Sequence, residues 1–148
     1  MKKVLIVSGV LAAMISSMPA HAENLRAALQ NFGLIGHWAS DCSAPIADDN
    51  TYAEYAMISE NEAELRYDFG PKYRKRTYAI RYATRIPGDQ IRMVVTDRAD
   101  SQNSQMIIRR VNGRIQTWSN EQSDGTVYIA NGIKVLNGQE ADWEVRCY

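Results

Sequence analysis

Apolar and polar side chains alternate along most of this chain with a period of two. The pattern is clearest over residues 63–69, where Leu65, Tyr67 and Phe69 are separated by charged residues. Successive side chains of a β-strand point to opposite faces of a sheet, so this period predicts strands with one buried face. Nine strands are predicted, over residues 34–40, 52–59, 63–69, 75–86, 90–97, 105–111, 114–119, 126–130 and 142–148.

The segments between these strands are short and rich in turn residues. Asn112-Gly113 is the strongest hairpin signal in the chain, and Asn and Gly at this place favour a tight two-residue turn. Only residues 23–32 place apolar side chains at helical spacing, with Gly33 as a C-terminal stop. The pattern therefore predicts one short N-terminal helix followed by an antiparallel meander, because no further helix is left to make parallel crossovers.

The first 22 residues follow a different pattern. Lys2 and Lys3 precede an apolar stretch, and Ala20-His21-Ala22 supplies the small residues of a cleavage site. This order is typical of a secretory signal peptide. A membrane anchor is the alternative, but the apolar stretch is well short of the ~20 residues that a span needs. We therefore expect a signal peptide, residues 1–22, cleaved after Ala22, and a single periplasmic domain over residues 23–148.

Two cysteines, Cys42 and Cys147, lie near the two ends of that domain. Export into an oxidising compartment favours a disulfide between them, with two free thiols or an intermolecular link as the alternatives. A meander of this length hides its edges by closing into a barrel or by splitting into a sandwich. A bridge that joins the first strand region to the last residues favours a small closed up-and-down barrel of eight or nine strands.

The charges restrict the partners that we expect. The chain has 17 Lys and Arg residues and 17 Asp and Glu residues, and removal of the signal peptide leaves a small negative net charge. A general attraction to nucleic acid is therefore not indicated. We expect a monomer that has no nucleic-acid partner and no transmembrane segment after signal cleavage.

Catalytic and metal-binding groups are sparse in residues 23–148. His37 is the only histidine there, and a Ser-His-Asp or Cys-His device would have to use it. Asp48, Asp49 and Asn50 offer oxygens for calcium, but loops are ordinarily rich in these residues. We therefore predict no catalytic residue, no metal site, no cofactor and no enzymatic activity, with catalysis through His37 as the remaining alternative.

Aromatic residues gather on the predicted inner faces. We predict that a ligand is bound by Tyr55, Tyr67, Tyr78, Tyr82 and Trp118. Tyrosines inside a small barrel need partners for their hydroxyl groups, which favours a polar network or a wet ligand cavity. An ordinary packed core is the alternative.

One dense basic run, residues 72–76, falls at the predicted end of a hairpin. Its Arg74, Lys75 and Arg76 are candidate contacts for an anionic partner such as lipid headgroups, a cell-wall polymer or an acidic protein face. The alternative is a solvated turn whose charges keep a sheet edge from aggregating.

Gly36-His37-Trp38 follows the predicted helix and opens the first strand, and it resembles the G-x-W signature of lipocalin-like, or calycin, barrels. The resemblance implies that Trp38 is a structural plug at one end of the barrel. It also implies that the cavity holds a small apolar or amphipathic molecule, and that Cys42 and Cys147 tie the barrel to its C-terminal region.

The same family places an arginine from near the last strand across the tryptophan. Arg146 has the right position in the sequence, but alternation puts it on the outer face, opposite to Trp143, Val145 and Cys147. Residues 36–45 also resemble uncharacterised periplasmic proteins of α-proteobacteria, and that second resemblance implies no activity.

The sequence as a whole predicts an exported, periplasmic, non-enzymatic β-barrel that binds a small amphipathic or hydrophobic ligand. A different class of function stays open beside it. In that alternative the domain is a protein-interaction module, either an inhibitor of an exported hydrolase or an accessory subunit of a cell-envelope complex.

Overall fold

The computed structural model describes residues 23–148, so the predicted signal peptide and its cleavage after Ala22 lie outside the described residues. Within residues 23–148 the chain forms one helix followed by ten strands. They are α1 (Leu25–Phe32), β1 (Gly36–Ala39), β2 (Tyr52–Met57), β3 (Ala63–Asp68), β4 (Arg76–Ile86), β5 (Gln90–Asp97), β6 (Asn103–Val111), β7 (Arg114–Gln122), β8 (Val127–Ala130), β9 (Ile133–Lys134) and β10 (Trp143–Arg146).

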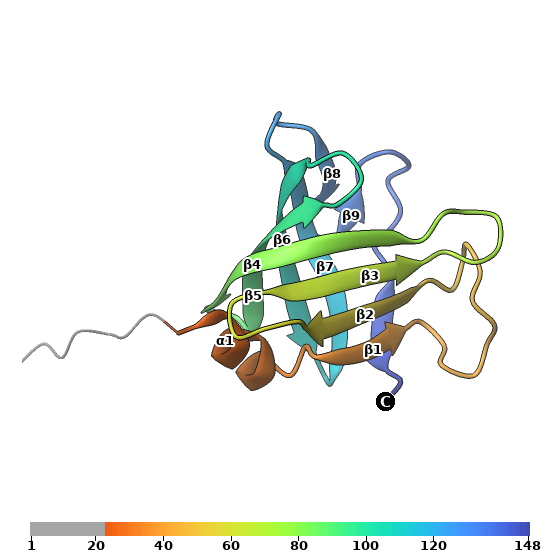
Figure 1. The fold of residues 1–148 in the computed structure, drawn as a ribbon. Helices are drawn as coiled ribbons and strands as arrows, with labels where there is room; N and C mark the ends of the chain where they lie inside the picture. The colour runs from red at the N-terminus through yellow and green to blue at the C-terminus, as the bar shows by residue number, and fades with distance from the viewer. Residues whose placement is uncertain (1–22) are drawn as a thin grey trace, which may run out of the picture.

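The strands form one antiparallel sheet that closes on itself (Figure 1). Each strand from β1 to β8 pairs with the strand that follows it, and β10 pairs with both β1 and β7. The closed barrel therefore has eight strands, β1 to β7 and β10, while β8 and β9 extend the sheet beyond β7. This confirms the predicted all-β closed antiparallel barrel, to which the structure adds the two-residue strand β9.

Helix α1 packs across the end of the barrel at β4 and β5. The Asn24 side chain accepts a hydrogen bond from the Ala27 amide at its start, and Gly33 ends it in the left-handed region at φ +75°. Its buried face is made of the apolar residues whose spacing predicts the helix. The helix thus closes one end, and no helix within residues 23–148 is long and apolar enough to cross a membrane.

A disulfide joins Cys42 and Cys147, whose Cα atoms are 5.3 Å apart, as the sequence predicts. The bridge lies beside the seam where β1 meets β10, and the backbone amide of Cys147 donates to the carbonyl of His37 at 2.7 Å. The first and last strands of the domain are therefore held together both covalently and by the sheet.

Two β-bulges overturn part of the predicted alternation. In β4 the register shifts between Ile80 and Tyr82, so Ile80 is fully buried whereas the Tyr82 side chain is 51% exposed on the outer surface. A second shift, between β6 and β7, leaves Trp118 opposite no residue of β6 and places it outside the barrel. Each bulge adds one unpaired residue, which reverses the inward and outward sides beyond it.

Strand β10 also faces the opposite way to the prediction. Arg146 pairs with the buried inner residue Trp38, and Glu144 lines the interior, so Arg146 lies on the inner side and Trp143 on the outer side. The apolar residues can point outward because that side is covered, with the guanidinium of Arg109 4.8 Å from the Trp143 ring. Alternation alone cannot recognise an outer face that other side chains cover.

Candidate functional site

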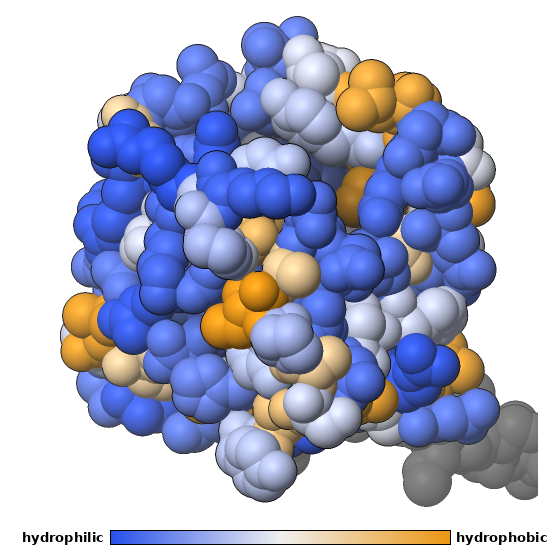
Figure 2. All heavy atoms as spheres, turned by 90° about the vertical axis from the view of Figure 1, so that its right-hand side faces the viewer, coloured by the Kyte–Doolittle hydropathy of each residue, from blue (hydrophilic) through white to orange (hydrophobic). Residues whose placement is uncertain are grey.

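A cavity of about 500 Å³ occupies the barrel beyond the packed core. This volume lies in the ~300–1,000 Å³ range that is typical of small-molecule sites. Figure 2 looks onto the end of the barrel that carries the β3–β4 loop and shows a few apolar side chains within a largely hydrophilic surface. The walls of the cavity come from strands β3 to β10. The lining side chains with a role below are Tyr67, Phe69, Arg76, Tyr78, Asp97, Ser104, Met106, Thr117, Asn120, Lys134, Asp142 and Glu144.

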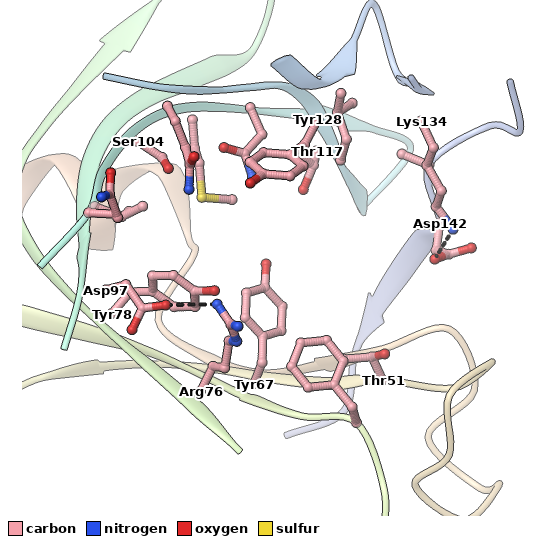
Figure 3. Close-up of a pocket in the computed structure, with 18 of the residues that line it drawn as sticks. Thr51, Tyr67, Arg76, Tyr78, Asp97, Ser104, Thr117, Tyr128, Lys134 and Asp142 are labelled. Carbon is pink, nitrogen blue, oxygen red and sulfur yellow. Dashed lines mark hydrogen bonds and ion pairs between the residues drawn. The ribbon is translucent and has the colours of Figure 1, made fainter. Parts of the chain in front are cut away.

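One wall of the cavity is aromatic. The ring of Tyr67 stacks on Phe69 with centroids 5.5 Å apart and meets Tyr78 edge-on at 6.0 Å. Figure 3 shows Tyr67 and Tyr78 on one side of the space and Thr117 and Tyr128 on the other. The cavity can therefore receive a molecule that is apolar on one side and polar on the other.

Two ion pairs take up four of the charged groups that line the cavity. Arg76 Nη1 lies 2.9 Å from Asp97 Oδ2, and Lys134 Nζ lies 2.9 Å from Asp142 Oδ2 (Figure 3). A hydrogen bond with Tyr78 is the main cause of a raised Arg76 pKa. Each positive charge in the lining thus already has a carboxylate partner within the protein.

Glu144 is the charged lining residue without such a partner. Within residues 23–148 its side chain makes no hydrogen bond or ion pair, although it is more buried than exposed. Burial raises the pKa of Glu144 to about 8, and the nearby Asp142 carboxylate adds to the rise. A carboxyl group that is costly to ionise and open to a cavity is a candidate for ligand contact.

Two tyrosines lie next to this carboxyl group. Burial and then the charge of Glu144 raise the pKa of Tyr67, whose hydroxyl hydrogen bonds with that of Tyr55. The pKa of Tyr55 is also raised well above its ordinary value, chiefly by burial. Both hydroxyl groups therefore stay protonated over the physiological range and offer dipoles, not charges, to the cavity.

The predicted ligand-binding residues divide into three groups. Tyr67 and Tyr78 line the cavity, as the alternation of β3 and β4 indicates. Tyr55 is fully buried beneath it, in contact with Tyr67. The prediction that Tyr82 and Trp118 face inward is wrong, because the bulges turn both to the outer surface. Ligand binding by any of them stays a prediction.

Trp38 lies in the packed core at the end opposite to the cavity mouth, and its indole Nε1 donates to the Leu34 carbonyl at 2.8 Å. Arg146 Nη2 donates to the Ile35 carbonyl at 2.7 Å. Gly36 has φ +135°, a conformation that favours glycine, and a Cβ there would crowd Arg146 Nε and the Tyr148 carbonyl, each at 3.1 Å. The glycine of the G-x-W motif thus lets the arginine cross it.

The basic run does not form one surface. Arg76 turns toward the cavity and pairs with Asp97, and Lys75 Nζ lies 2.7 Å from Asp68. Arg74 is exposed and has no ion pair among the residues described. The acids therefore neutralise most of the run, and its contact with a partner stays a prediction.

The residues considered for catalysis and for calcium lie apart from the cavity. His37 is exposed on β1, and Asp48 is 3.9 Å from the surface residue Lys72. Asn50 is buried, and its Oδ1 accepts from the Asp41 amide, which fixes the 40–51 loop. Residues 23–148 contain no group of three or more His, Cys, Asp and Glu side chains arranged to hold a metal.

The sequence reasoning missed most of the polar residues of the cavity, among them Asp97, Asn120 and Glu144. Asp97 ends a strand whose inner positions are otherwise apolar. Because it lies two residues after the buried Val95, alternation places it on the inner face, and this could have identified it. Glu144 is three positions before Cys147, so the two side chains lie on opposite faces of the strand. Because Cys147 reaches outward to the 40–51 loop, Glu144 is expected to point inward.

No family model matches the chain, and no curated protein and no solved structure matches it either.

Proposed function

We propose that this protein is an exported, lipocalin-like barrel that holds a small amphipathic or hydrophobic molecule and carries out no catalysis. The observation that carries the proposal is the cavity of about 500 Å³ inside a closed barrel. The G-x-W sequence at Gly36, with Trp38 in the core and Arg146 across the glycine, supports the likeness to lipocalins. The disulfide supports an oxidising compartment such as the periplasm.

The amphipathic character of the ligand follows from the two kinds of cavity wall. Phe69, Tyr67 and Met106 present apolar surface, whereas Ser104 and Thr117 present hydroxyl groups. A ligand with a hydrocarbon part and one polar group would satisfy both. Burial of the hydrocarbon part supplies the affinity, at roughly 25 cal/mol per Å² of apolar surface removed from water.

The first prediction tests whether the cavity binds anything. We expect Thr117→Trp to weaken binding of octan-1-ol at least tenfold, because an indole on this inner wall fills much of the space that the ligand would occupy. Isothermal titration calorimetry of the oxidised protein, residues 23–148, provides the measurement.

Gln105→Trp is the matched control, since Gln105 lies on an adjacent strand but is exposed on the outer face. We expect it to bind octan-1-ol as the wild type does. Equal binding by wild type and Thr117→Trp, or no binding of any alkyl probe by the wild type, would refute the proposed function.

A further inference from the structure

We propose that the cavity selects ligands that carry a primary ammonium group, with the Glu144 carboxylate and the aromatic wall as the recognition site. The inference rests on the proposed function and adds to it the chemical class of the ligand. It is carried by the balance of charges in the lining, by the unpaired Glu144 carboxyl group and by the aromatic rings that line the same cavity.

The charge balance of the lining is the first argument. Arg76 is paired with Asp97 and Lys134 with Asp142, each at 2.9 Å. Once Glu144 has lost its proton, the lining holds one carboxylate more than it holds cations, and the excess belongs to Glu144. A cationic ligand would restore neutrality, whereas an anionic ligand would place a second negative charge in a poorly solvated space.

The second argument comes from hydrogen bonding. Ionised Glu144 offers acceptors to the cavity and has no hydrogen-bond donor among the described residues. An ammonium group, which has three donors and no acceptor, matches a carboxylate better than a hydroxyl or a second carboxylate does.

The third argument is the position of the aromatic wall. Tyr67 is close enough to Glu144 for the carboxylate charge to raise the pKa of its hydroxyl, and its ring joins those of Phe69 and Tyr78. The faces of such rings attract cations, most strongly where water is excluded. A carboxylate beside aromatic rings therefore favours an ammonium group over a neutral polar group.

Ammonium binding must be coupled to loss of the Glu144 proton. Burial and Asp142 raise the pKa of this carboxyl group to about 8, so at neutral pH a cation has to displace a proton before it binds. Tyr55 and Tyr67 face Glu144 from β2 and β3, and both stay neutral. The two strands paired with β10 are β1 and β7, and their inner side chains next to Glu144, which are Trp38, Ile115 and Thr117, carry no charge. Affinity for a cation should therefore rise with pH.

The remaining charged groups around the interior belong to pairs or to the closed end. They are Arg76, Asp97, Lys134 and Asp142 at the cavity, and Arg110 and Arg146 near α1. The pKa of Glu144, about 8, falls between pH 6 and pH 9, so this carboxyl group is expected to titrate in that window.

The test compares three probes with the same octyl chain: octylammonium, octan-1-ol and octanoate. Calorimetric titration of the oxidised protein at pH 9 should give tightest binding to octylammonium, which is still protonated there because amines of this kind have a pKa near ~10.4. Its affinity should fall by up to about a hundredfold from pH 9 to pH 6, while the affinity for octan-1-ol stays constant.

Glu144→Gln isolates the carboxylate. We expect it to weaken octylammonium binding at pH 9 about tenfold or more and to abolish its pH dependence, with octan-1-ol binding unchanged. Glu121→Gln is the matched control, because it removes the same charge from the exposed outer side of β7. It should leave all three affinities as they are.

The outcomes separate the two proposals. If octan-1-ol binds and octylammonium shows no preference, no pH dependence or no sensitivity to Glu144→Gln, the ammonium site is refuted and the binding barrel stands. If no octyl probe binds, both proposals are refuted.

Discussion

Glu144 shows how a single side chain can set the chemistry of a barrel interior. A carboxyl group that faces a cavity and lacks a partner opposes folding once it is ionised, and apolar residues would fit the position at no such cost. Strongly perturbed pKa values of this kind cluster at functional sites. The free-energy cost that ionised Glu144 imposes on folding can be measured directly.

The pH dependence of stability gives that measurement. The folded protein holds the Glu144 proton up to a pKa of about 8, whereas the unfolded chain releases it near the ordinary glutamate pKa of 4.5. The folded state therefore binds more protons between these values, and the free energy of unfolding should fall as the pH rises through this window. Glu144→Gln should match the wild type at pH 5 and exceed its stability at pH 9 by on the order of 2–4 kcal/mol.

Urea unfolding at pH 5 and pH 9 checks this expectation. Carboxyl groups with lowered pKa values, such as Asp41, Asp68 and Glu140, are present in both proteins and cancel in the difference. Parallel stability curves for wild type and Glu144→Gln over this range would show that Glu144 ionises in the folded protein as easily as in the unfolded chain.

The sequence predicts where the strands lie along the chain better than it predicts which side chains of a strand point into the barrel. Alternation correctly directs Tyr67 and Tyr78 inward, because the facing parts of β3 and β4 are regular up to Ile80. It fails for Tyr82 and Trp118, which lie at or beyond bulges. A bulge has no strong residue signature, so its inversion of the two faces appears only when the partner strands are known.

The outer surface near β10 explains why Trp143 points outward, against the prediction from alternation. Arg109 lies over Trp118 at 4.0 Å and Trp143 at 4.8 Å, and its Nε donates to Gln116 Oε1 at 2.8 Å. Trp143 in turn donates to Glu140 at 2.9 Å. These contacts bridge β6, β7 and β10, so they brace the pairing of β10 with β7, which helps to close the barrel.

Removal of Arg109 tests this brace. Arg109→Ala should lower the free energy of unfolding by about 1–3 kcal/mol, because it removes two cation–π contacts and leaves buried Gln116 without one hydrogen-bond partner. Urea unfolding gives the stability, and tryptophan emission should shift to the red as Trp118 and Trp143 gain water.

The control for this element is Arg81→Ala. Arg81 is exposed at the β4 bulge and makes no ion pair among the residues described, so its loss should change stability by less than about 0.5 kcal/mol. Equal effects of the two substitutions would show that the stack on β10 contributes nothing beyond a surface arginine.

At the scale of the whole molecule, the barrel divides into a packed part and a hollow part. In the part that α1 covers, large apolar side chains such as Leu29, Ile80 and Ile108 are fully buried in one core cluster. Toward the other end the inner positions become polar or aromatic and the cavity opens. The sequence predicts closure through its cysteines and its meander, but the free volume depends on how tilted strands combine, which residue pattern alone does not specify.

Barrel closure itself should survive loss of the disulfide, although its stability should not. Cys42 and Cys147 are 105 residues apart in sequence, so their crosslink restricts the unfolded chain strongly, by about 4–5 kcal/mol in the entropic account. The pairing of β10 with β1 and β7 does not depend on the sulfur atoms. The double variant Cys42→Ala, Cys147→Ala should therefore keep its far-ultraviolet circular dichroism and its octan-1-ol binding while its urea midpoint drops sharply. Wild-type stability in this variant would contradict the entropic account, and loss of sheet content or of binding below the unfolding transition would show that the bridge, rather than the strand pairing, closes the barrel.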